Sequence, residues 1–531
     1  MKNTVLKLQN LSAGYNGEDV IRDISFEVGT GEIFALVGES GSGKSTVLKT
    51  IMGLPSNGVR ISGGGLTFNR QKLTELSAEE RRQLLGEKLC TVFQNPATSM
   101  NPIRKIRSQF LDTMRSHNRS DTEKSLAAIR TAFTKLGLGD ADRVLDCCPF
   151  ELSGGMCQRV SLAMAMVMEP SLILADEPTS ALDVMNQRQV IDEFRILREE
   201  CRASILLVTH NISLASHIAD RVAIMHQGEI VECGVTGEVL NSPQNSYTKK
   251  LIADVPCVRT VCPVYDYSSK FLEVSNVTKR YSVAERTIEA VRDVGFTLSR
   301  GEVLGIVGES GSGKSTLSRQ LLQLEKTDEG SIRYDGEEVT AMNRRSLCTL
   351  YRRAQMVFQI PLTSFDQNKR IRVTMRDAVR NLTNRKRKKA ADEYINELMC
   401  RVGLTPELAD RYPWEISGGQ CQRAAIARAL VAEPELLICD EATSALDVSS
   451  QARIADLLRS LVRKSNMSMI FISHDIALVS GLCNTVMVMK NGRCVEYGPV
   501  EKVITDPESE YTMELLKASS FCYKDQLFCS L

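Results

Sequence analysis

A nine-residue segment that occurs twice, letter for letter, constrains this 531-residue chain more than any other feature. GESGSGKST spans Gly38–Thr46 and again Gly308–Thr316, so its two lysines are 270 positions apart. A shared order of motifs over such distances predicts two copies of one large domain and excludes a solenoid of short repeats. Four further pairs recur in the same order, the first at an offset of 265 and the others at 264: Gln94 and Gln359, Ser153 and Ser417, Asp176 and Asp440, and His210 and His474.

The boundaries of the two copies follow from where the helix and strand patterns stop and restart. Residues 247–252 have helical spacing, Pro256 and Pro263 then interrupt it, and a strand pattern restarts at Phe271. We therefore predict a first domain at 1–255, a linker at 256–270, a second domain at 271–517 and a C-terminal tail at 518–531.

Each copy alternates short apolar runs with segments of helical periodicity. The runs at 33–37 and 303–307 are typical of buried parallel strands, and each leads through the glycine-rich segment into a helix pattern. Strands that alternate with helices indicate an α/β fold with a parallel sheet. Further strands are predicted at 172–175, 436–439, 205–209 and 469–473, with a helix over 190–197.

The repeated segment has the GxxxxGK[S/T] spacing of a phosphate-binding loop. Glycines let successive backbone N–H groups face one anion at the start of a helix, whose dipole also favours negative charge. A glycine turn without a ligand is the alternative, but two identical copies in a strand–turn–helix context favour the loop. The predicted nucleotide contacts are Gly38, Ser40, Gly41, Ser42, Gly43, Lys44, Ser45 and Thr46 in the first copy, and Gly308, Ser310, Gly311, Ser312, Gly313, Lys314, Ser315 and Thr316 in the second.

Within this loop the lysines, Lys44 and Lys314, are expected to reach the β- and γ-phosphates, and the hydroxyls of Ser45 and Ser315 to bind Mg²⁺. Asp176 and Asp440 each end an apolar run, where a carboxylate can hold the Mg²⁺ shell. These four residues are therefore predicted metal ligands, together with the glutamines considered below.

The acidic residues that follow these aspartates, Glu177 and Glu441, are candidate general bases that polarise an attacking water. A plain helix N-terminal charge is the alternative for one copy taken alone. The spacing from each aspartate to its histidine, 34 residues in both copies, favours the catalytic interpretation.

The histidines and glutamines complete the predicted catalytic set. His210 and His474 are expected to hydrogen-bond the γ-phosphate, although a core histidine is the alternative for each. Only five histidines occur in the chain, and two of them hold equivalent positions. Gln94 and Gln359 are candidates to sense Mg²⁺ and the attacking water.

A second anion site is predicted at Ser153-Gly154-Gly155 and at Ser417-Gly418-Gly419, each of which precedes a helix pattern. The alternative is a helix cap without a ligand, but a cap alone does not require two glycines.

These segments together closely resemble the nucleotide-binding subunits of ATP-binding cassette (ABC) transporters, over about residues 4–255 and 271–517. The resemblance implies two tandem P-loop NTPase domains, each with a RecA-like core, an antiparallel β subdomain and a helical subdomain. It also implies that each ATP is held between the phosphate loop of one copy and the Ser-Gly-Gly segment of the other. Tyr15 and Tyr281 match the aromatic residue that stacks on adenine, with an ordinary strand-edge tyrosine as the alternative. Because both copies keep the reactive residues, we predict two hydrolysis-competent sites.

Finer details resemble the oligopeptide, dipeptide and nickel importers of that family. Residues 95–102 are similar to its extended glutamine loop, and 242–248 and 506–512 to its domain-closing segment, whereas 361–366 departs from the usual pattern. The resemblance implies the ATPase of a binding-protein-dependent importer for peptides, or for nickel or a metal chelate. It implies two transmembrane permease subunits and an extracytoplasmic binding protein as partners, and a peripheral location at the cytoplasmic face of the cell membrane.

The composition and the linker argue against several other classes of protein. With 66 Lys and Arg against 65 Asp and Glu, the net charge of +1 argues against bulk nucleic acid as the main partner. No run reaches the ~18 uncharged apolar residues of a membrane span, and no signal peptide is recognisable.

The alternative to a transporter subunit is a soluble tandem-cassette ATPase that acts on ribosomes. Such proteins typically carry a long charged linker, whereas the gap here is short and contains two prolines.

The sixteen cysteines are scattered, and we expect most to be free thiols. Cys257 and Cys262 near the linker and Cys522 and Cys529 in the tail could ligate an iron–sulfur cluster, as C-terminal cysteines do in some peptide importer subunits. Their spacing differs from that family's, so free thiols are favoured over a cluster.

Overall fold

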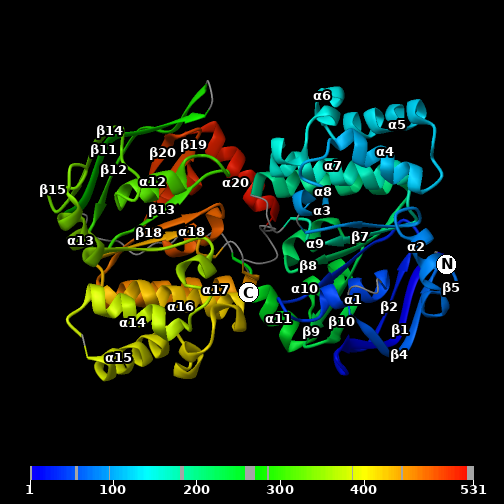
Figure 1. The fold of residues 1–531 in the computed structure, drawn as a ribbon, viewed down its shortest axis with the longest axis horizontal. Coiled ribbons are helices and arrows are strands. Elements are labelled where there is room, and N and C mark those ends of the chain that lie inside the picture. Colours follow the sequence, from blue (N-terminus) through cyan, green and yellow to red (C-terminus); the bar gives the residue numbers. More distant parts are fainter. Residues whose placement is uncertain are drawn as a thin grey trace. The chain divides into compact units, whose positions relative to one another are not determined.

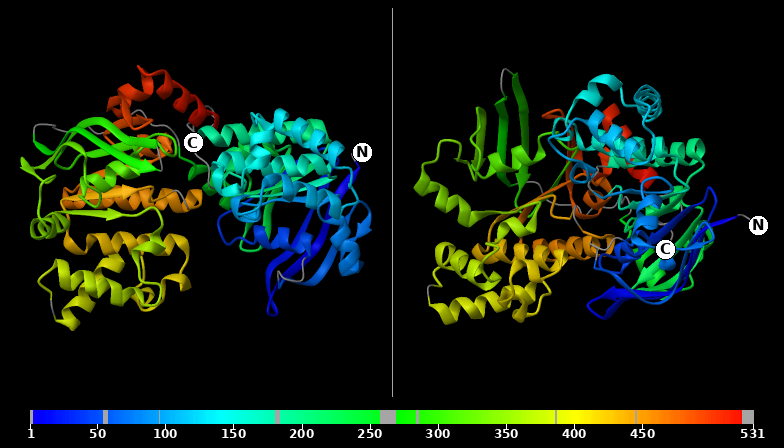
Figure 2. Two further views of the ribbon diagram at one scale, coloured as in Figure 1. Left: turned by 45° about the horizontal axis from the view of Figure 1, so that its top comes forward. Right: turned by 45° about the vertical axis from the view of Figure 1, so that its right-hand side comes forward.

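The computed structural model describes residues 3–53, 58–94, 96–179, 184–256, 269–283, 286–385, 387–443 and 446–522. The chain divides into two compact units, Met1–Val255 and Pro256–Tyr523, both drawn in Figures 1 and 2. Of the four cysteines considered for a cluster, Cys257, Cys262 and Cys529 lie outside the described part, and so does the side chain of Cys522.

Unit 1 contains two sheets. A four-stranded antiparallel sheet has the order β2-β1-β4-β5, and a six-stranded sheet has the order β10-β9-β3-β8-β7-β6, in which only β10 pairs antiparallel. The strands are β1 Thr4–Tyr15, β2 Glu18–Gly29, β3 Ile33–Val37, β4 Arg60–Phe68, β5 Gln71–Lys72, β6 Leu89–Val92, β7 Leu172–Asp176, β8 Ser204–Thr209, β9 Arg221–His226 and β10 Glu229–Val235. The helices are α1 Lys44–Met52, α2 Ala78–Leu84, α3 Pro96–Ser99, α4 Ile106–Ser116, α5 Thr122–Lys135, α6 Ala141–Asp146, α7 Gly154–Met168, α8 Val184–Cys201, α9 Ile212–Ile218, α10 Thr236–Asn241 and α11 Ser246–Ala253, with 3₁₀ turns at η2 Leu73–Glu75 and η3 Pro149–Glu151.

Unit 2 repeats this plan. Its sheets have the orders β12-β11-β14-β15 and β16-β17-β18-β13-β19-β20. The strands are β11 Lys270–Val283, β12 Arg286–Ser299, β13 Val303–Val307, β14 Glu329–Tyr334, β15 Glu337–Glu338, β16 Ala354–Val357, β17 Leu436–Asp440, β18 Ser468–Ser473, β19 Thr485–Lys490 and β20 Arg493–Pro499. The helices are α12 Lys314–Leu321, α13 Arg344–Arg353, α14 Ile371–Leu382, α15 Lys388–Arg401, α16 Gly418–Ala429, α17 Val448–Ser465, α18 Ile476–Leu482, α19 Val500–Thr505 and α20 Glu510–Cys522, with 3₁₀ turns at η4 Pro361–Ser364, η5 Pro406–Asp410, η6 Pro413–Glu415 and η7 Leu430–Ala432.

The uncharged runs became the central strands because they are apolar on both faces. Every residue of β3 and of β13 is buried, and β3 lies between β8 and β9 in parallel register, with Ile33 opposite Ile205. Helices cover the parallel sheet, as such a sheet requires. The carboxyl ends of β3, β7 and β8 therefore meet at one edge, which is the edge that carries the predicted site.

The predicted strands are confirmed to within one residue at each end, and the helix predicted over 190–197 lies inside the longer α8, Val184–Cys201. The helix after the second glycine-rich segment ends at Leu321, because Leu322 already leaves helical geometry. Residues 518–522, which the sequence places in the tail, form the last turns of α20, and Ala518 and Ser519 are buried. Within the described residues, no helix has the length and hydropathy needed to cross a bilayer.

Candidate functional site

The two glycine-rich segments fold into tight loops that only glycine permits. Gly41 and Gly43 have φ of 81° and 104°, in the left-handed region where a side chain is strained. At Gly38 a Cβ atom would lie 2.3 Å from the carbonyl oxygen of Met225, and at Gly308 it would lie 2.2 Å from that of Met489. The first glycine of each loop therefore packs against the strand next to β3 or β13. Because the glycines have no side chains, the N–H groups of the loop backbone are not covered by them.

The loop lysines are folded back over their own loops. Lys44 Nζ donates to the carbonyl oxygens of Gly38 and Glu39 at 2.8 and 2.7 Å, and it lies 3.4 Å from Ser42 Oγ. Lys314 makes the same contacts with Gly308, Glu309 and Ser312, at 2.8, 2.7 and 3.3 Å. Each lysine is buried, so the ammonium group is held at the centre of the curl, where a phosphate can exchange for the carbonyls.

The helices that follow the loops present uncapped N-termini. Gly43 and Gly313 occupy the N-cap positions of α1 and α12, with no side-chain cap and no acidic residue in the first turn. The first backbone N–H groups of a helix need an acceptor. Together with the helix dipole they favour an anion at this point.

The predicted acidic pairs end the strands β7 and β17. The glutamates Glu177 and Glu441 have φ of 45° and 47°, a strained conformation for a residue with a side chain. The strain is held by backbone hydrogen bonds: Glu177 N–H donates to Val208 at 2.8 Å and Glu441 N–H to Ile472 at 3.0 Å. The turn aims each glutamate toward the neighbouring strand end.

The two aspartates lie among buried groups. Burial and the adjacent glutamate raise the pKa of Asp176 and of Asp440 above the ordinary value. Ser315 Oγ donates to Asp440 Oδ1 at 3.0 Å. In unit 1, Asp176 Oδ1 is buried and has no hydrogen-bond partner among the described residues.

The glutamines and one histidine converge on the glutamates. Gln94 Nε2 lies 3.2 Å from Glu177 Oε2, and Gln359 Nε2 lies 2.6 Å from Glu441 Oε2. His210 Nδ1 also lies 3.2 Å from Glu177 Oε2. Burial alone would raise the pKa of Glu177, but the hydrogen bond and charge of His210, with Lys44, hold that pKa below its ordinary value. His474 follows β18 as His210 follows β8.

The Ser-Gly-Gly segments are helix N-termini, as predicted. Ser153 caps α7 by accepting the N–H of Met156 at 3.3 Å, and Ser417 caps α16 by accepting that of Gln420 at 3.3 Å. Both serines are exposed, and so are the adjacent Gly154 and Gly418, while Gly155 and Gly419 are half-buried. Since each hydroxyl serves the cap as an acceptor, its proton is available to an incoming anion.

The candidate adenine-stacking tyrosines stand near their phosphate loops. Tyr15 ends β1, and Lys49 Nζ of α1 lies 5.9 Å from its ring centroid. Tyr281 lies in β11, where its hydroxyl donates to Glu325. Burial and Glu325 raise the pKa of Tyr281, and a hydrogen bond with Thr316 acts in the opposite direction. Both rings are half-buried, so each has an accessible part.

Two residues of the site were missed in the sequence. Tyr247 and Tyr511, from the predicted domain-closing segments, accept the N–H of Glu39 and Glu309 in the phosphate loops, at 3.4 and 3.1 Å. They are separated by the same 264 positions as the other paired features. That register was the signal that could have identified them.

A bare glycine loop between a buried strand and an uncapped helix, a lysine folded into it and a carboxylate pair on the same sheet edge define a P-loop nucleoside triphosphatase. The sequence model of the ABC transporter family matches residues 21–180 and 291–444, one match in each unit. The chain belongs to this family, and with two cassettes it is an ATP-hydrolysing subunit.

Named relatives align with nearly the whole chain. An uncharacterized ABC transporter ATP-binding protein, YejF of Escherichia coli K12, is 38% identical, covering 98% of this chain and 100% of the relative. The glutathione import ATP-binding protein GsiA of Pectobacterium atrosepticum is 37% identical, covering 97% of this chain and 89% of the relative. The ATP-binding cassette MJ0796, solved as a dimer with ADP and phosphate, covers 43% of this chain at 26% identity with a TM-score of 0.41.

Proposed function

We propose that this chain powers a binding-protein-dependent importer of peptides, and that one polypeptide supplies both ATPase domains. The observation that carries the proposal is the full-length similarity to a glutathione import ATP-binding protein, since glutathione is a small peptide. Nickel and metal chelates are second candidates that rest on the sequence resemblance alone.

We propose the same residue roles in both units. The N–H groups of the loop and of the first turn of α1 or α12 bind the phosphates, and Lys44 or Lys314 exchanges its carbonyl partners for phosphate oxygens. Tyr15 or Tyr281 supports the adenine. Glu177 or Glu441 accepts a proton from the attacking water, which Gln94 or Gln359 orients. His210 and His474 donate to the γ-phosphate.

The aspartates and the loop serines fit Mg²⁺. Hard cations prefer oxygen ligands, and the pair Ser315 and Asp440 already lies at hydrogen-bond distance, 3.0 Å. In unit 1 the buried, unpartnered oxygen of Asp176 supports the same assignment with Ser45. The bound cation would neutralise charge that develops on the phosphates. The Gln94 and Gln359 side-chain oxygens are proposed as additional ligands.

The Ser-Gly-Gly segments are proposed to complete the nucleotide sites. Each exposed serine and the helix N-terminus that it caps can bind an anion. Unlike the phosphate loops, however, the two Ser-Gly-Gly segments do not directly follow a strand of the sheet. We propose that each segment contacts the ATP bound by the other unit, so that ATP closes the two units and hydrolysis reopens them.

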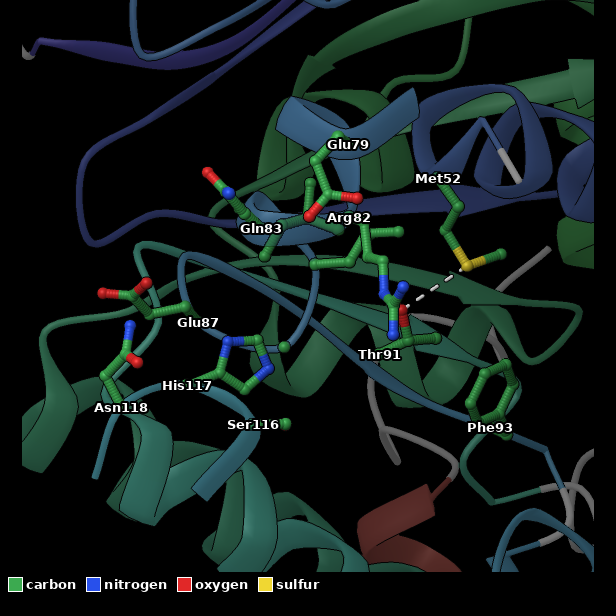
Figure 3. Close-up of a pocket in the computed structure, with 13 residues that line it drawn as sticks. Met52, Glu79, Arg82, Gln83, Glu87, Thr91, Phe93, Ser116, His117 and Asn118 are labelled. Atoms are coloured by element: carbon green, nitrogen blue, oxygen red, sulfur yellow. Dashed lines mark hydrogen bonds between the residues drawn. The ribbon is translucent and has the colours of Figure 1, made fainter. Parts of the chain in front are cut away.

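A cavity of about 820 Å³ lined in part by Phe93 is proposed to receive a permease segment in unit 1. Figure 3 shows Phe93 on one side of this pocket and Glu87 and Asn118 on the other. Phe93 is 44% exposed and directly precedes Gln94, which contacts Glu177. A segment seated here is therefore only one residue from the partner of the proposed base, which offers a short route from the membrane subunits to the ATPase. With permeases bound there, the chain would lie peripherally at the inner membrane.

The ribosome-bound alternative is not favoured, because the relatives that align with both units carry transporter names. No iron–sulfur cluster is proposed. The cysteines considered for one lie outside the described residues or have a side chain that does, so free thiols stay a prediction from the sequence.

Uptake by whole cells tests the importer proposal. A strain that lacks this gene should lose uptake of labelled glutathione or of a dipeptide, and the wild-type gene should restore it. F93E should leave ATP hydrolysis by the purified chain within about twofold of wild type but fail to restore uptake, because a charge replaces the exposed aromatic ring that the permease segment is proposed to cover. Normal peptide uptake in the deletion strain, combined with defective nickel uptake, would instead identify the second candidate.

A further inference from the structure

A tyrosine hydroxyl from the C-terminal part of each unit reaches the phosphate loop from outside. Tyr247 on α11 accepts the N–H of Glu39 at 3.4 Å, and Tyr511 on α20 accepts the N–H of Glu309 at 3.1 Å. More than 200 residues of sequence separate the two ends of each contact. The contact therefore joins the closing helix of each unit to the start of its nucleotide loop.

The peptide group between Gly38 and Glu39 is held from both sides. Its carbonyl oxygen accepts Lys44 Nζ at 2.8 Å, and its N–H donates to the tyrosine. The corresponding peptide of unit 2 is held in the same way by Lys314 and Tyr511. When the lysine leaves for a phosphate, the tyrosine is the side-chain contact that still fixes the orientation of this peptide.

The tyrosine rings are themselves packed. Tyr247 stacks on His226, with ring centroids 3.9 Å apart and an interplanar angle of 30°. Tyr511 is 4% exposed, and Lys490 Nζ lies 4.3 Å from its ring centroid. His226 and Lys490 hold equivalent positions at the ends of β9 and β19, so each unit supports its tyrosine with a different side chain at one place.

A carboxylate positions the turn in front of each closing helix. Glu232 on β10 accepts the N–H groups of Gln244 and Asn245 at 2.8 and 3.2 Å. In unit 2, Glu496 on β20 accepts those of Glu508 and Ser509 at 2.9 and 3.1 Å. The acceptors lie 264 positions apart, as do the tyrosines. A carboxylate that accepts hydrogen bonds from two backbone N–H groups holds them strongly. The turn before the closing helix is therefore fixed in position, and the tyrosine on that helix is positioned with it.

We propose that Tyr247 and Tyr511 are positioning residues for ATP binding: each holds the first peptide of its phosphate loop in the binding-competent orientation while the loop lysine moves to the nucleotide. The inference rests on the proposed function in one respect, that Lys44 and Lys314 bind the phosphates of ATP. It predicts an effect on affinity for ATP rather than on the chemical step, because the hydroxyl touches the loop and not the reacting atoms.

The double variant Y247F/Y511F tests this in the full-length chain, since phenylalanine keeps the packed ring and removes only the hydroxyl. We expect KM for ATP to rise about fivefold, the factor that typically accompanies loss of one neutral hydrogen bond, while kcat changes by less than about twofold. Amide hydrogen exchange at Glu39 and Glu309, measured without nucleotide, should become faster. Y394F is the control, because the buried Tyr394 also loses a hydrogen-bonding hydroxyl, which lies 3.2 Å from Val431 O and 3.1 Å from Glu433 Oε1, away from either loop.

The outcomes separate the alternatives. An unchanged KM with unchanged exchange at both amides would overturn the inference. A fall in kcat and in melting temperature at constant KM, or an equal effect of Y394F, would show a merely structural role and also overturn it. If the wild-type chain did not hydrolyse ATP at all, the proposed function would fail, while the exchange measurement would still decide whether the tyrosines hold the loops.

Discussion

The two units share the contacts of the phosphate-loop lysine almost atom for atom and differ at the helix that follows the Ser-Gly-Gly segment. The contacts of Lys44 and of Lys314 with their loops agree within 0.1 Å. By contrast, Ser417 and Gln420 form a reciprocal capping box at the start of α16, whereas Met156 stands at that position in unit 1 and only the serine cap remains. The glycine-rich loop therefore has the same sequence and the same lysine contacts in both units, whereas the start of the helix after the Ser-Gly-Gly segment differs.

The same helices differ again one turn further on. Arg159 of α7 donates to Glu193 Oε1 of α8 at 3.0 Å, and Glu193 is 4% exposed. In unit 2 the equivalent arginine, Arg423, donates to the carbonyl oxygen of Gly403 at 3.0 Å, as Arg159 also does to that of Gly137 at 3.5 Å. The contact with the glutamate has no counterpart there, because Leu457 replaces it. Burial, then the charge of Arg453, lowers the pKa of Arg423. Unit 1 thus carries a buried ionisable pair that its twin lacks.

The largest expected difference between the units is in their response to pH. Burial raises the pKa of Glu193 to about 7, against the opposing effect of Arg159. A folded-state pKa above the unfolded one gives stability that is complete below about pH 4.5 and is lost as pH rises through about 7. E193Q should therefore stabilise unit 1 at pH 8 by about 1–3 kcal/mol and leave it nearly unchanged at pH 5. Urea unfolding followed by hydrogen exchange of α8 peptides measures this.

Unit 2 serves as the internal control for that experiment, because Leu457 cannot titrate. Its unfolding can be followed separately through Trp414, which is the single tryptophan of the chain. Equal stabilisation of unit 1 by E193Q at both pH values would contradict the assignment of the pH response to Glu193.

A smaller difference is expected from the helix caps. Q420M removes the side-chain half of the capping box, in which Gln420 Oε1 accepts Ser417 N–H at 3.0 Å. We expect it to lower the free energy of unfolding of unit 2 by about 0.5–1 kcal/mol. M156Q should raise that of unit 1 by a similar amount. A neutral effect of M156Q combined with a destabilising effect of Q420M would contradict this prediction, because the starts of α7 and α16 would then not be equivalent.

The sequence predicted the fold and most of the site because the decisive signals are local. Three short motifs each predict their local structure from neighbouring residues: the glycine loop after an apolar run, the acidic pair at the end of a strand, and the serine at the start of a helix. Contacts between distant segments gave no local signal. The hydroxyl of Tyr247 meets the amide of Glu39 only after the whole unit has folded, and the burial of Glu193 beside Arg159 depends on how α7 and α8 pack. The end of α20 was missed for a similar reason, because the burial of Ala518 comes from tertiary packing.

Both units are proposed to hydrolyse ATP. The direct test is the steady-state turnover of two variants, E177Q and E441Q, each made in the otherwise unchanged chain. These substitutions keep side-chain size and remove the proposed base of one unit, so each should lower the turnover of the whole chain by about half or more, and the double variant should retain only background activity. Wild-type turnover in either single variant would contradict the account, because that unit would then contribute no catalytic base of its own.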